Sequence, residues 1–262
     1  LCIATPSMAE KKYGPGASDT AIKVGQTMPY SGPASAYGVI GKAEVAYFTM
    51  LNEKGGINGR KVELLSLDDG YSPPKTVEQT RKLVEQEQVL LIFQSLGTPT
   101  NTATQKYLNA KKVPQIFLAT GANKWSDPKN FPWTMGWNPS YRAEARIYAQ
   151  HILETKPNAK LAVLFQNDAF GKDYVLGLES MLGDKAAKMI VAKASYEVTD
   201  PTIDSQIVTL QASGADTLLT FATPKFAAQV IRKVHDIGWK PLHYMANVSI
   251  SVAAVLAPAG LD

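Results

Sequence analysis

The sequence predicts an α/β fold of two successive lobes, each a mostly parallel sheet covered by helices. Short apolar runs alternate with segments whose apolar residues recur at helical spacing, which is the pattern of βαβ units. A stretch with two prolines and two tryptophans, at residues 130–139, interrupts this alternation, and the same pattern then resumes. We therefore expect an N-terminal lobe at 22–132, a crossing segment at 133–139 and a C-terminal lobe at 140–262.

The first βαβ unit spans residues 22–69. A strand begins at Ile22, and residues 62–67 form the next strand, parallel to it. The helix between them ends at Gly55-Gly56, because glycine enters a left-handed C-cap at little steric cost. The apolar residues of this helix fall on one face, which comprises Val39, Ala43, Ala46, Tyr47, Met50 and Leu51.

The same unit contains three motifs in a fixed order: MPYSGP at 28–33, Tyr37-Gly38, and NEKGGINGR at 52–60. With them the chain resembles the branched-chain amino-acid-type (Leu/Ile/Val-binding-protein-like) solute-binding proteins of bacterial ABC importers, from residue 22 to its end. The resemblance implies a two-lobed periplasmic-binding-protein type I fold. Members of that family are longer, so the resemblance also implies that the second lobe is incomplete in this chain.

Each later strand of the predicted fold is followed by a helix. The run at 89–93 is continuously apolar, which is typical of a parallel strand covered on both faces. We expect further strands at 114–118, 161–165, 189–197, 217–221 and 242–245, and helices at 73–84, 100–110, 141–152, 172–182, 203–212, 225–237 and 252–256.

The composition is that of a folded globular protein. Hydrophobic residues make up 45% of the 262 residues, enough for one or two ordinary cores, and the charged share of 19% argues against bulk disorder. The net charge of +4 is spread along the chain, so pairs such as Arg60-Lys61 are interpreted as solvated surface and no nucleic-acid partner is expected. No segment after the N-terminus approaches the ~20 apolar residues of a membrane-spanning helix.

Residues 1–9, LCIATPSMA, resemble the end of a secretory signal peptide, with small residues at Ser7 and Ala9 before a cleavage point. We interpret them as a signal-peptide remnant and residues 10–21 as a mobile leader; a disordered segment without a targeting role is the alternative. Cys2 is the only cysteine and would leave with the signal, although a lipoprotein anchor there stays open. We therefore expect export to the periplasm, where a chain without cysteine needs no disulfide.

Catalytic and metal-binding signatures are missing from the sequence. It contains no HExxH, CxxC, GxSxG or phosphate-loop motif, and His151 and His235 lie inside predicted helices, where a structural role is expected. Asp68 and Asp69 are adjacent on a strand and point to opposite faces, so they suit a turn better than a shared acid–base or metal site. We expect no enzyme activity, no cofactor and no metal.

Candidate ligand-binding residues lie in the loops that follow the strands, since ligands of open α/β sheets bind beyond the carboxyl ends of strands. Two of these loops contain small residues and threonines, so their amides and hydroxyls could hold a carboxylate. The candidates are Leu96, Gly97, Thr98, Ala119, Thr120, Gly121 and Ala122, together with Thr223 after a later strand. We expect Gly97→Val to block the approach of a ligand to the backbone with little effect on the fold.

The resemblance assigns roles to these residues. It implies that the two small-residue loops grip the ligand carboxylate and that Tyr37 forms an aromatic wall. It also places Phe170 where the family often has tyrosine; plain packing is the alternative for both aromatics. Trp125 and Trp133 are assigned to hinge packing, and Trp137 either to hinge packing or to closure over a ligand.

The expected ligand is a small carboxylate-type molecule: an amino acid, an aromatic or aliphatic acid, or an amide. Amino-acid binders of the family pair the ligand ammonium with an acidic residue in the second lobe, whereas residues 245–250 contain no carboxylate. A free α-amino acid is therefore disfavoured, with the alternative that a segment after Asp262 supplies the acidic residue.

The expected protein is an extracytoplasmic, monomeric solute-binding protein that closes its lobes on the ligand and delivers it to the membrane permease of an ABC importer. The alternatives are a ligand-sensing receptor or regulator domain on the same fold, and a doubly wound enzyme.

Overall fold

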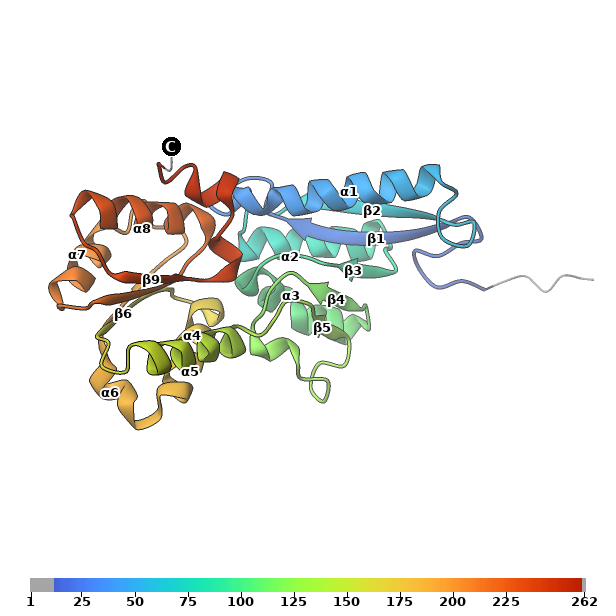
Figure 1. The fold of residues 1–262 in the computed structure, drawn as a ribbon. Helices are drawn as coiled ribbons and strands as arrows, with labels where there is room; N and C mark the ends of the chain where they lie inside the picture. Colours follow the sequence, from blue (N-terminus) through green and yellow to red (C-terminus); the bar gives the residue numbers. More distant parts are fainter. Residues whose placement is uncertain (1–11, 261–262) are drawn as a thin grey trace, which may run out of the picture.

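The computed structural model describes residues 12–260 of the chain. Within this part the strands form two separate sheets that lie side by side in the molecule (Figure 1). The predicted signal-peptide remnant at 1–9, with Cys2, and the first residues of the leader lie outside the described residues. None of the helices between residues 12 and 260 is long and apolar enough to span a bilayer.

The first sheet has the order β2-β1-β3-β4-β5, and its described neighbours pair in parallel. Its strands are β1 Ala21–Met28, β2 Lys61–Asp68, β3 Leu91–Phe93, β4 Gln115–Leu118 and β5 Thr134–Gly136. β5 lies inside the stretch predicted to be only a crossing segment, because its backbone pairs with β4. The chain thus completes the edge of the first sheet before it crosses to the second lobe.

The second sheet has the order β7-β6-β8-β9 and is also parallel. Its strands are β6 Leu161–Gln166, β7 Ile190–Tyr196, β8 Thr217–Phe221 and β9 Leu242–Met245. β6 and β8 are almost wholly buried, as expected for central strands with helices on both faces. The sheet thus has the doubly covered arrangement that the apolar runs predict.

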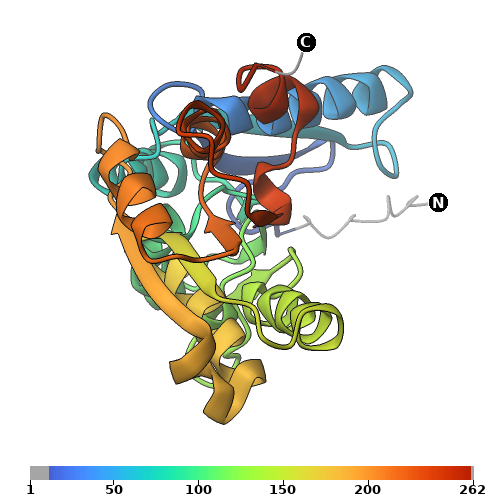
Figure 2. The same ribbon diagram turned by 60° about the vertical axis from the view of Figure 1, so that its left-hand side comes forward.

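Helices connect the strands in both lobes (Figures 1 and 2). They are α1 Gly38–Glu53, α2 Pro73–Arg81, α3 Thr98–Lys111, α4 Tyr141–Thr155, α5 Ala169–Leu182, α6 Ala186–Met189, α7 Asp204–Ala212 and α8 Pro224–Asp236. Shorter helical turns are η1 Ser35–Tyr37, η2 Lys82–Gln86, η3 Asn123–Trp125, η4 Gly183–Lys185, η5 Asn247–Ser249 and η6 Val252–Leu256.

The second lobe has a core on each face of its sheet. On one face α4 and α5 bury Ile152, Tyr174 and Leu178 against the strands. On the other face α7 and α8 bury residues such as Ile207 and Phe226. The first lobe has a smaller core, in which η2 and α3 pack on one face of its sheet. Burial of these apolar surfaces is the main favourable term in folding.

Helix α1 does not use its apolar face to contact the first sheet. Gly41 and Glu44 face the strands instead: Gly41 allows close approach of Tyr30, and Glu44 accepts a hydrogen bond from Gln26. The apolar face found in the sequence therefore points outward, with Val39 65% exposed and Tyr47 56% exposed. Amphipathic spacing correctly indicates the helix, but contacts with the strands, including Phe48 against Phe93, decide which side packs on the sheet.

A row of aromatic rings crosses this side of the first sheet from α1 to the end of β5. Successive ring centroids lie 5.5–6.0 Å apart in edge-to-face contact, and the row runs through Tyr47, Phe48, Phe93, Phe117 and Trp137. Trp137, at the end of the row, is 64% exposed. This side of β3 to β5 is thus less covered than the side on which α2 and α3 pack.

The described part of the predicted mobile leader, residues 12–21, is hydrogen-bonded to the start of β1, and its last residue, Ala21, already belongs to that strand. The Gly16 carbonyl accepts from the Lys23 amide at 2.7 Å, and Ser18 Oγ accepts from the Ala21 amide at 2.9 Å. These bonds satisfy backbone groups at the beginning of the strand. The segment therefore has a specific structure that its polar, glycine-containing sequence did not predict.

Candidate functional site

A cavity of about 820 Å³ lies between the two sheets, at the carboxyl ends of their strands. Its walls come from both lobes, as the topology of open α/β sheets predicts. The lining residues are Ala36, Tyr37, Val39, Ile40, Tyr71, Gln94, Leu96, Gly97, Thr98, Ala119, Trp137, Asn138, Tyr141, Phe170, Thr223, Pro224, Asn247, Val248, Ile250, Ser251, Ala253 and Ala254. The volume is in the range of small-molecule sites, which makes this cavity the candidate ligand site.

Seven of the ten candidate residues line this cavity: Tyr37, Leu96, Gly97, Thr98, Ala119, Phe170 and Thr223. The other three, Thr120, Gly121 and Ala122, line a second cavity of about 340 Å³. At Gly121 a side chain would collide with the Pro139 carbonyl oxygen and the Tyr141 ring. Its lack of a side chain therefore serves the packing of the crossing segment against the end of β4.

The loop that leads into α3 is held in place by its own backbone and by α3. Gly97 has φ +105°, a conformation that favours glycine. Asn101 Nδ2 donates to the carbonyls of Ser95 and Gly97, at 2.9 and 2.8 Å. Thr98, the first residue of α3, is buried beside the cavity. The loop is thus preorganised to present Thr98.

The same geometry corrects one expectation. A Cβ on Gly97 would lie 2.6 Å from Thr100 Oγ1 and 2.6 Å from a ring carbon of Tyr71. Real Cβ atoms do not approach neighbours so closely, and φ +105° adds backbone strain to the overlap. The expectation that Gly97→Val leaves the fold intact is therefore wrong.

The lining is uncharged. Among the cavity-lining residues there is no Asp, Glu, Lys, Arg or His, and four of them are aromatic rings of Tyr or Phe. Asp168, near the cavity, caps α5 by accepting from the Phe170 amide at 2.8 Å and accepts from Gln166 Nε2 at 2.6 Å. Burial raises the pKa of Asp168 despite these bonds. The walls therefore offer apolar contact and neutral hydrogen bonds and contain no side-chain counter-ion.

Tyr37 links the two lobes beside the cavity. It stands at the end of η1 in the first lobe, and its hydroxyl donates to the Val248 carbonyl of the second lobe at 3.0 Å. Burial raises the pKa of Tyr37 well above the usual tyrosine value, so the hydroxyl stays protonated and remains a donor at neutral pH. The residue is thus both a wall of the cavity and a bond between the lobes.

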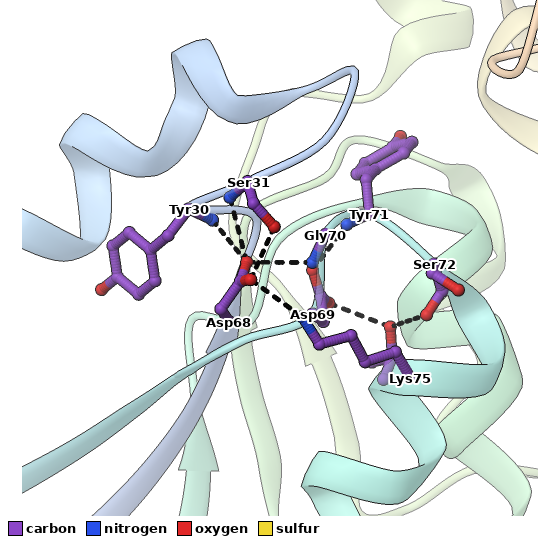
Figure 3. A network of polar contacts seen from close by, with 9 residues as sticks. Tyr30, Ser31, Asp68, Asp69, Gly70, Tyr71, Ser72 and Lys75 are labelled. Carbon is purple, nitrogen blue, oxygen red and sulfur yellow. Dashed lines mark hydrogen bonds and ion pairs between the residues drawn. The ribbon is translucent and has the colours of Figure 1, made fainter.

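The turn after β2 is built by two carboxylates with different tasks (Figure 3). Asp68 Oδ1 accepts from the amides of Tyr30, Ser31 and Gly70, each at 3.0 Å. Asp68 Oδ2 accepts from Ser31 Oγ at 2.6 Å and Lys75 Nζ at 2.8 Å. The first carboxylate therefore fastens the loop after β1 to the end of β2.

Asp69 is fully buried and holds the next residues of the same turn. It accepts from the Tyr71 amide and from Thr76 Oγ1, both at 2.9 Å. Tyr71 adopts φ +60°, rare for a tyrosine, and its ring points away from the two carboxylates (Figure 3). That ring reaches the cavity wall. Asp68 and Asp69 thus form a turn, in agreement with the sequence interpretation. Through this turn they also set the position of Tyr71 in the cavity wall.

The two carboxyl groups have opposite pKa shifts. Burial alone would raise the pKa of Asp68, but the hydrogen bonds from Lys75, Ser31 and the backbone outweigh it and hold the pKa far below the usual value. Burial raises the pKa of Asp69, and its hydrogen bonds do not fully offset that cost. Asp68 is therefore charged at all ordinary pH values. Within residues 12–260, no group of three or more His, Cys, Asp or Glu side chains is placed to hold a metal ion.

Comparison with known proteins agrees with this geometry. The family model described as "Periplasmic binding protein" matches residues 21–262. The chain belongs to the periplasmic binding protein family.

Individual relatives are distant and longer than this chain. The chain is 25% identical over 251 residues to "Leu/Ile/Val-binding protein homolog 7" of Brucella abortus, a match that covers 90% of this chain and 60% of that protein. It is similar in structure to a substrate-binding periplasmic protein of Ralstonia solanacearum, with TM-score 0.82 and 26% identity over 91% of this chain and 67% of the other.

A third similar structure is a fatty acid ABC transporter substrate-binding protein from Thermomonospora curvata. It has TM-score 0.80 and 23% identity, over 95% of this chain and 63% of the other, so the likeness is one of fold. The chain thus spans about three fifths to two thirds of the length of these relatives.

Several cavity residues of this periplasmic binding protein were not selected from its sequence. Tyr71 follows the Asp-Asp-Gly turn, and that turn after a strand is a signal that could have pointed to it. Tyr141 starts α4 and belongs to the cavity through its ring. Asn247 and Val248 follow β9, another strand end, and could have been found by the same rule as Thr98.

Proposed function

We propose that this chain belongs to an extracytoplasmic solute-binding protein that holds a small molecule between its two lobes. The observation that carries the proposal is the uncharged cavity at the carboxyl ends of both sheets. In this role the protein acts as a monomer in the periplasm and delivers the ligand to the membrane permease of an ABC importer. It performs no covalent chemistry.

The proposed ligand has a carboxylate at one end and an apolar, preferably aromatic, body. The names of the relatives do not choose the ligand, since one refers to Leu, Ile and Val and another to a fatty acid. The cavity itself supports the choice. Thr98 and the start of α3 offer hydrogen-bond donors for an anion, while Phe170, Tyr141 and Tyr37 offer aromatic walls.

A free α-amino acid fits less well, because its ammonium group would need a partner. Burial of an unpaired charge costs several kcal/mol in real proteins, on the order of the whole affinity of a millimolar ligand. The lining residues contain no carboxylate, and Asp168 is already engaged with Gln166 and the α5 amides. We therefore place amino acids below acids that lack an amino group.

Two measurements test this proposal. Native mass spectrometry of the purified chain should show a retained small molecule. A thermal-shift and calorimetric panel should then rank phenylacetate and medium-chain alkanoates above their neutral amides, and above leucine and phenylalanine. Stabilisation by neutral compounds or by amino acids, with none by carboxylates, would refute the anion assignment.

The variant Thr98→Ala tests the site itself. A hydrogen bond to a charged group contributes about 1.5–3 kcal/mol. Its loss should weaken carboxylate binding by roughly ten- to a hundredfold, since ~1.4 kcal/mol is one decade in Kd. Thr209→Ala, an exposed helical threonine of α7 far from the cavity, is the matched control. Unchanged binding in Thr98→Ala would remove the 96–98 loop from the site.

A further inference from the structure

Thr120 does not line the main cavity, yet its hydroxyl is the centre of a buried hydrogen-bond network. Three donors are directed at Thr120 Oγ1: the Trp125 indole Nε1 at 3.3 Å, the Tyr141 hydroxyl at 3.4 Å and the Ala122 amide at 3.5 Å. A fourth and much shorter contact, of 2.6 Å, joins it to Thr98 Oγ1. Both threonine side chains are about 1% exposed, so solvent does not complete the network.

The direction of the short bond follows from counting donors and acceptors. A hydroxyl has one proton and two acceptor lone pairs, whereas an indole N–H and a backbone amide can only donate. Trp125 and Ala122 therefore direct two donor-only groups at the oxygen of Thr120. Thr120 has no capacity left to accept from Thr98, and its own proton needs an acceptor. The bond thus runs from the Thr120 hydroxyl to Thr98 Oγ1.

This direction determines what Thr98 presents to the cavity. Because Thr98 Oγ1 accepts from Thr120, one of its two lone pairs is occupied and its own proton is left to donate. Thr98 is one of the residues that line the main cavity, so this proton is the group that its side chain can donate to a ligand that reaches it. The three donors lie 3.3–3.5 Å from Thr120 Oγ1, so each of these hydrogen bonds is weak. The bond between Thr120 and Thr98, which they orient, is short.

We propose that Thr120 and Trp125 are positioning residues that fix the Thr98 hydroxyl as a hydrogen-bond donor and so select ligands by their acceptor end group. The inference rests on the proposed function, since it explains how that site distinguishes a carboxylate. A carboxylate only accepts and forms charge-assisted bonds about twice as strong as neutral ones. An ammonium group only donates, so it cannot accept the Thr98 proton.

The test measures selectivity, which a merely structural role would not change. The probes are phenylacetate, phenylacetamide and phenethylamine, with binding to the full 262-residue chain measured by calorimetry. Thr120→Val, of nearly the same shape, should weaken phenylacetate binding about tenfold and phenylacetamide binding two- to threefold at most. Thr120→Ser, which keeps the hydroxyl, should restore the wild-type ratio. Equal losses for acid and amide in Thr120→Val would overturn the inference.

A second readout needs no ligand. The indole N–H of Trp125 should have a resolved ¹H–¹⁵N resonance that moves upfield in Thr120→Val, because it loses its acceptor, and returns in Thr120→Ser. An unmoved resonance would overturn the inference even if no probe bound. Failure of every carboxylate to bind the wild type, with the resonance shifted as expected, would instead refute the proposed ligand and leave the network confirmed.

Discussion

Replacement of Asp68 by asparagine tests whether the turn after β2 is held by a charged carboxylate. Asparagine can keep one oxygen in the place of Oδ1, which accepts from three backbone amides. It puts an NH₂ group in place of Oδ2, opposite two donors, Ser31 Oγ and Lys75 Nζ. The substitution therefore removes the ion pair and one hydroxyl bond and leaves the rest of the turn intact.

The size of the effect follows from these two losses. The side chains of Lys75 and Asp68 are 40% and 32% exposed, so their ion pair is screened and contributes about 0.5–1 kcal/mol. The bond from Ser31 contributes about 1 kcal/mol. Asp68→Asn should thus lower the free energy of unfolding by about 1–2 kcal/mol. In a chain of this size that corresponds to a fall in Tm of roughly 3–6 °C at pH 7.

The pH dependence gives the sharper result. The pKa of Asp68 in the folded protein lies far below its unfolded value, near 3.9. The ionised carboxylate therefore stabilises the folded state at pH values above that unfolded pKa. This stabilisation is lost as the pH falls further towards the folded pKa. Urea unfolding between pH 7 and pH 3 should show that the difference in free energy of unfolding between wild type and Asp68→Asn becomes smaller as the pH approaches 3.

Asp69→Asn is the matched control, because it changes the neighbouring carboxylate of the same turn. Burial raises the folded pKa of Asp69, so ionised Asp69 costs stability above that pKa, and the cost disappears as the pH falls through it. Relative to Asp69→Asn, the wild type should therefore gain stability on acidification. The assignment of charge would be refuted by a stability difference between wild type and Asp68→Asn that stays constant from pH 7 to pH 3. It would also be refuted if the stability differences for Asp68→Asn and Asp69→Asn changed in the same direction on acidification.

Three further predictions concern the bond between the lobes, the glycine of the α3 loop and a histidine of β9. Tyr37→Phe removes the hydroxyl bond to the Val248 carbonyl, worth about 0.5–1.5 kcal/mol, and should weaken ligand binding about two- to tenfold in calorimetry, with a fall in Tm of roughly 1–5 °C. Gly97→Ala should lower Tm by several degrees, because its Cβ has no room and φ +105° is strained, at a cost of about 1–3 kcal/mol. Burial lowers the pKa of His243 to about 4, so the wild type should lose stability relative to His243→Gln as the pH falls from about 6.5 to about 4.

Each of these three predictions could be contradicted by a specific result. Tyr37→Phe binding as tightly as the wild type would show that the bond between the lobes does not hold the bound form. Gly97→Ala with an unchanged Tm would mean that the α3 loop relaxes freely around a side chain. A pH-independent difference between His243→Gln and the wild type in urea titrations would show that His243 titrates alike in the folded and unfolded states.

The sequence alone predicted most of the elements and the region of the site, but it missed β5 and the structure of residues 12–20. Apolar spacing located the strands and helices, since a parallel strand covered on both faces has a continuous apolar run and a helix has a 3.6-residue period. The rule that ligands bind beyond the carboxyl ends of strands then led to Leu96, Gly97 and Thr98, which line the cavity. These are local properties, determined by which residues adjoin each other along the chain.

The tertiary structure decided which side of each element is used. Gly41, Glu44 and Phe48 turn to the first sheet, outside the face that the apolar spacing marks. Close approach to Tyr30, a hydrogen bond from Gln26 and ring contact with Phe93 are available there. Spacing cannot show this, since it depends on residues from a different strand.

The different roles of Thr98, which lines the main cavity, and Thr120, which does not, are also decided by the tertiary structure. Both are threonines in loops after strands, and the sequence treats them alike. Only the fold places Thr120 behind Thr98 and brings the donors of Trp125 and Ala122 to its acceptor positions. A hydrogen-bond direction depends on all the donors and acceptors that meet at one point in space, and the chain brings these together only when it folds.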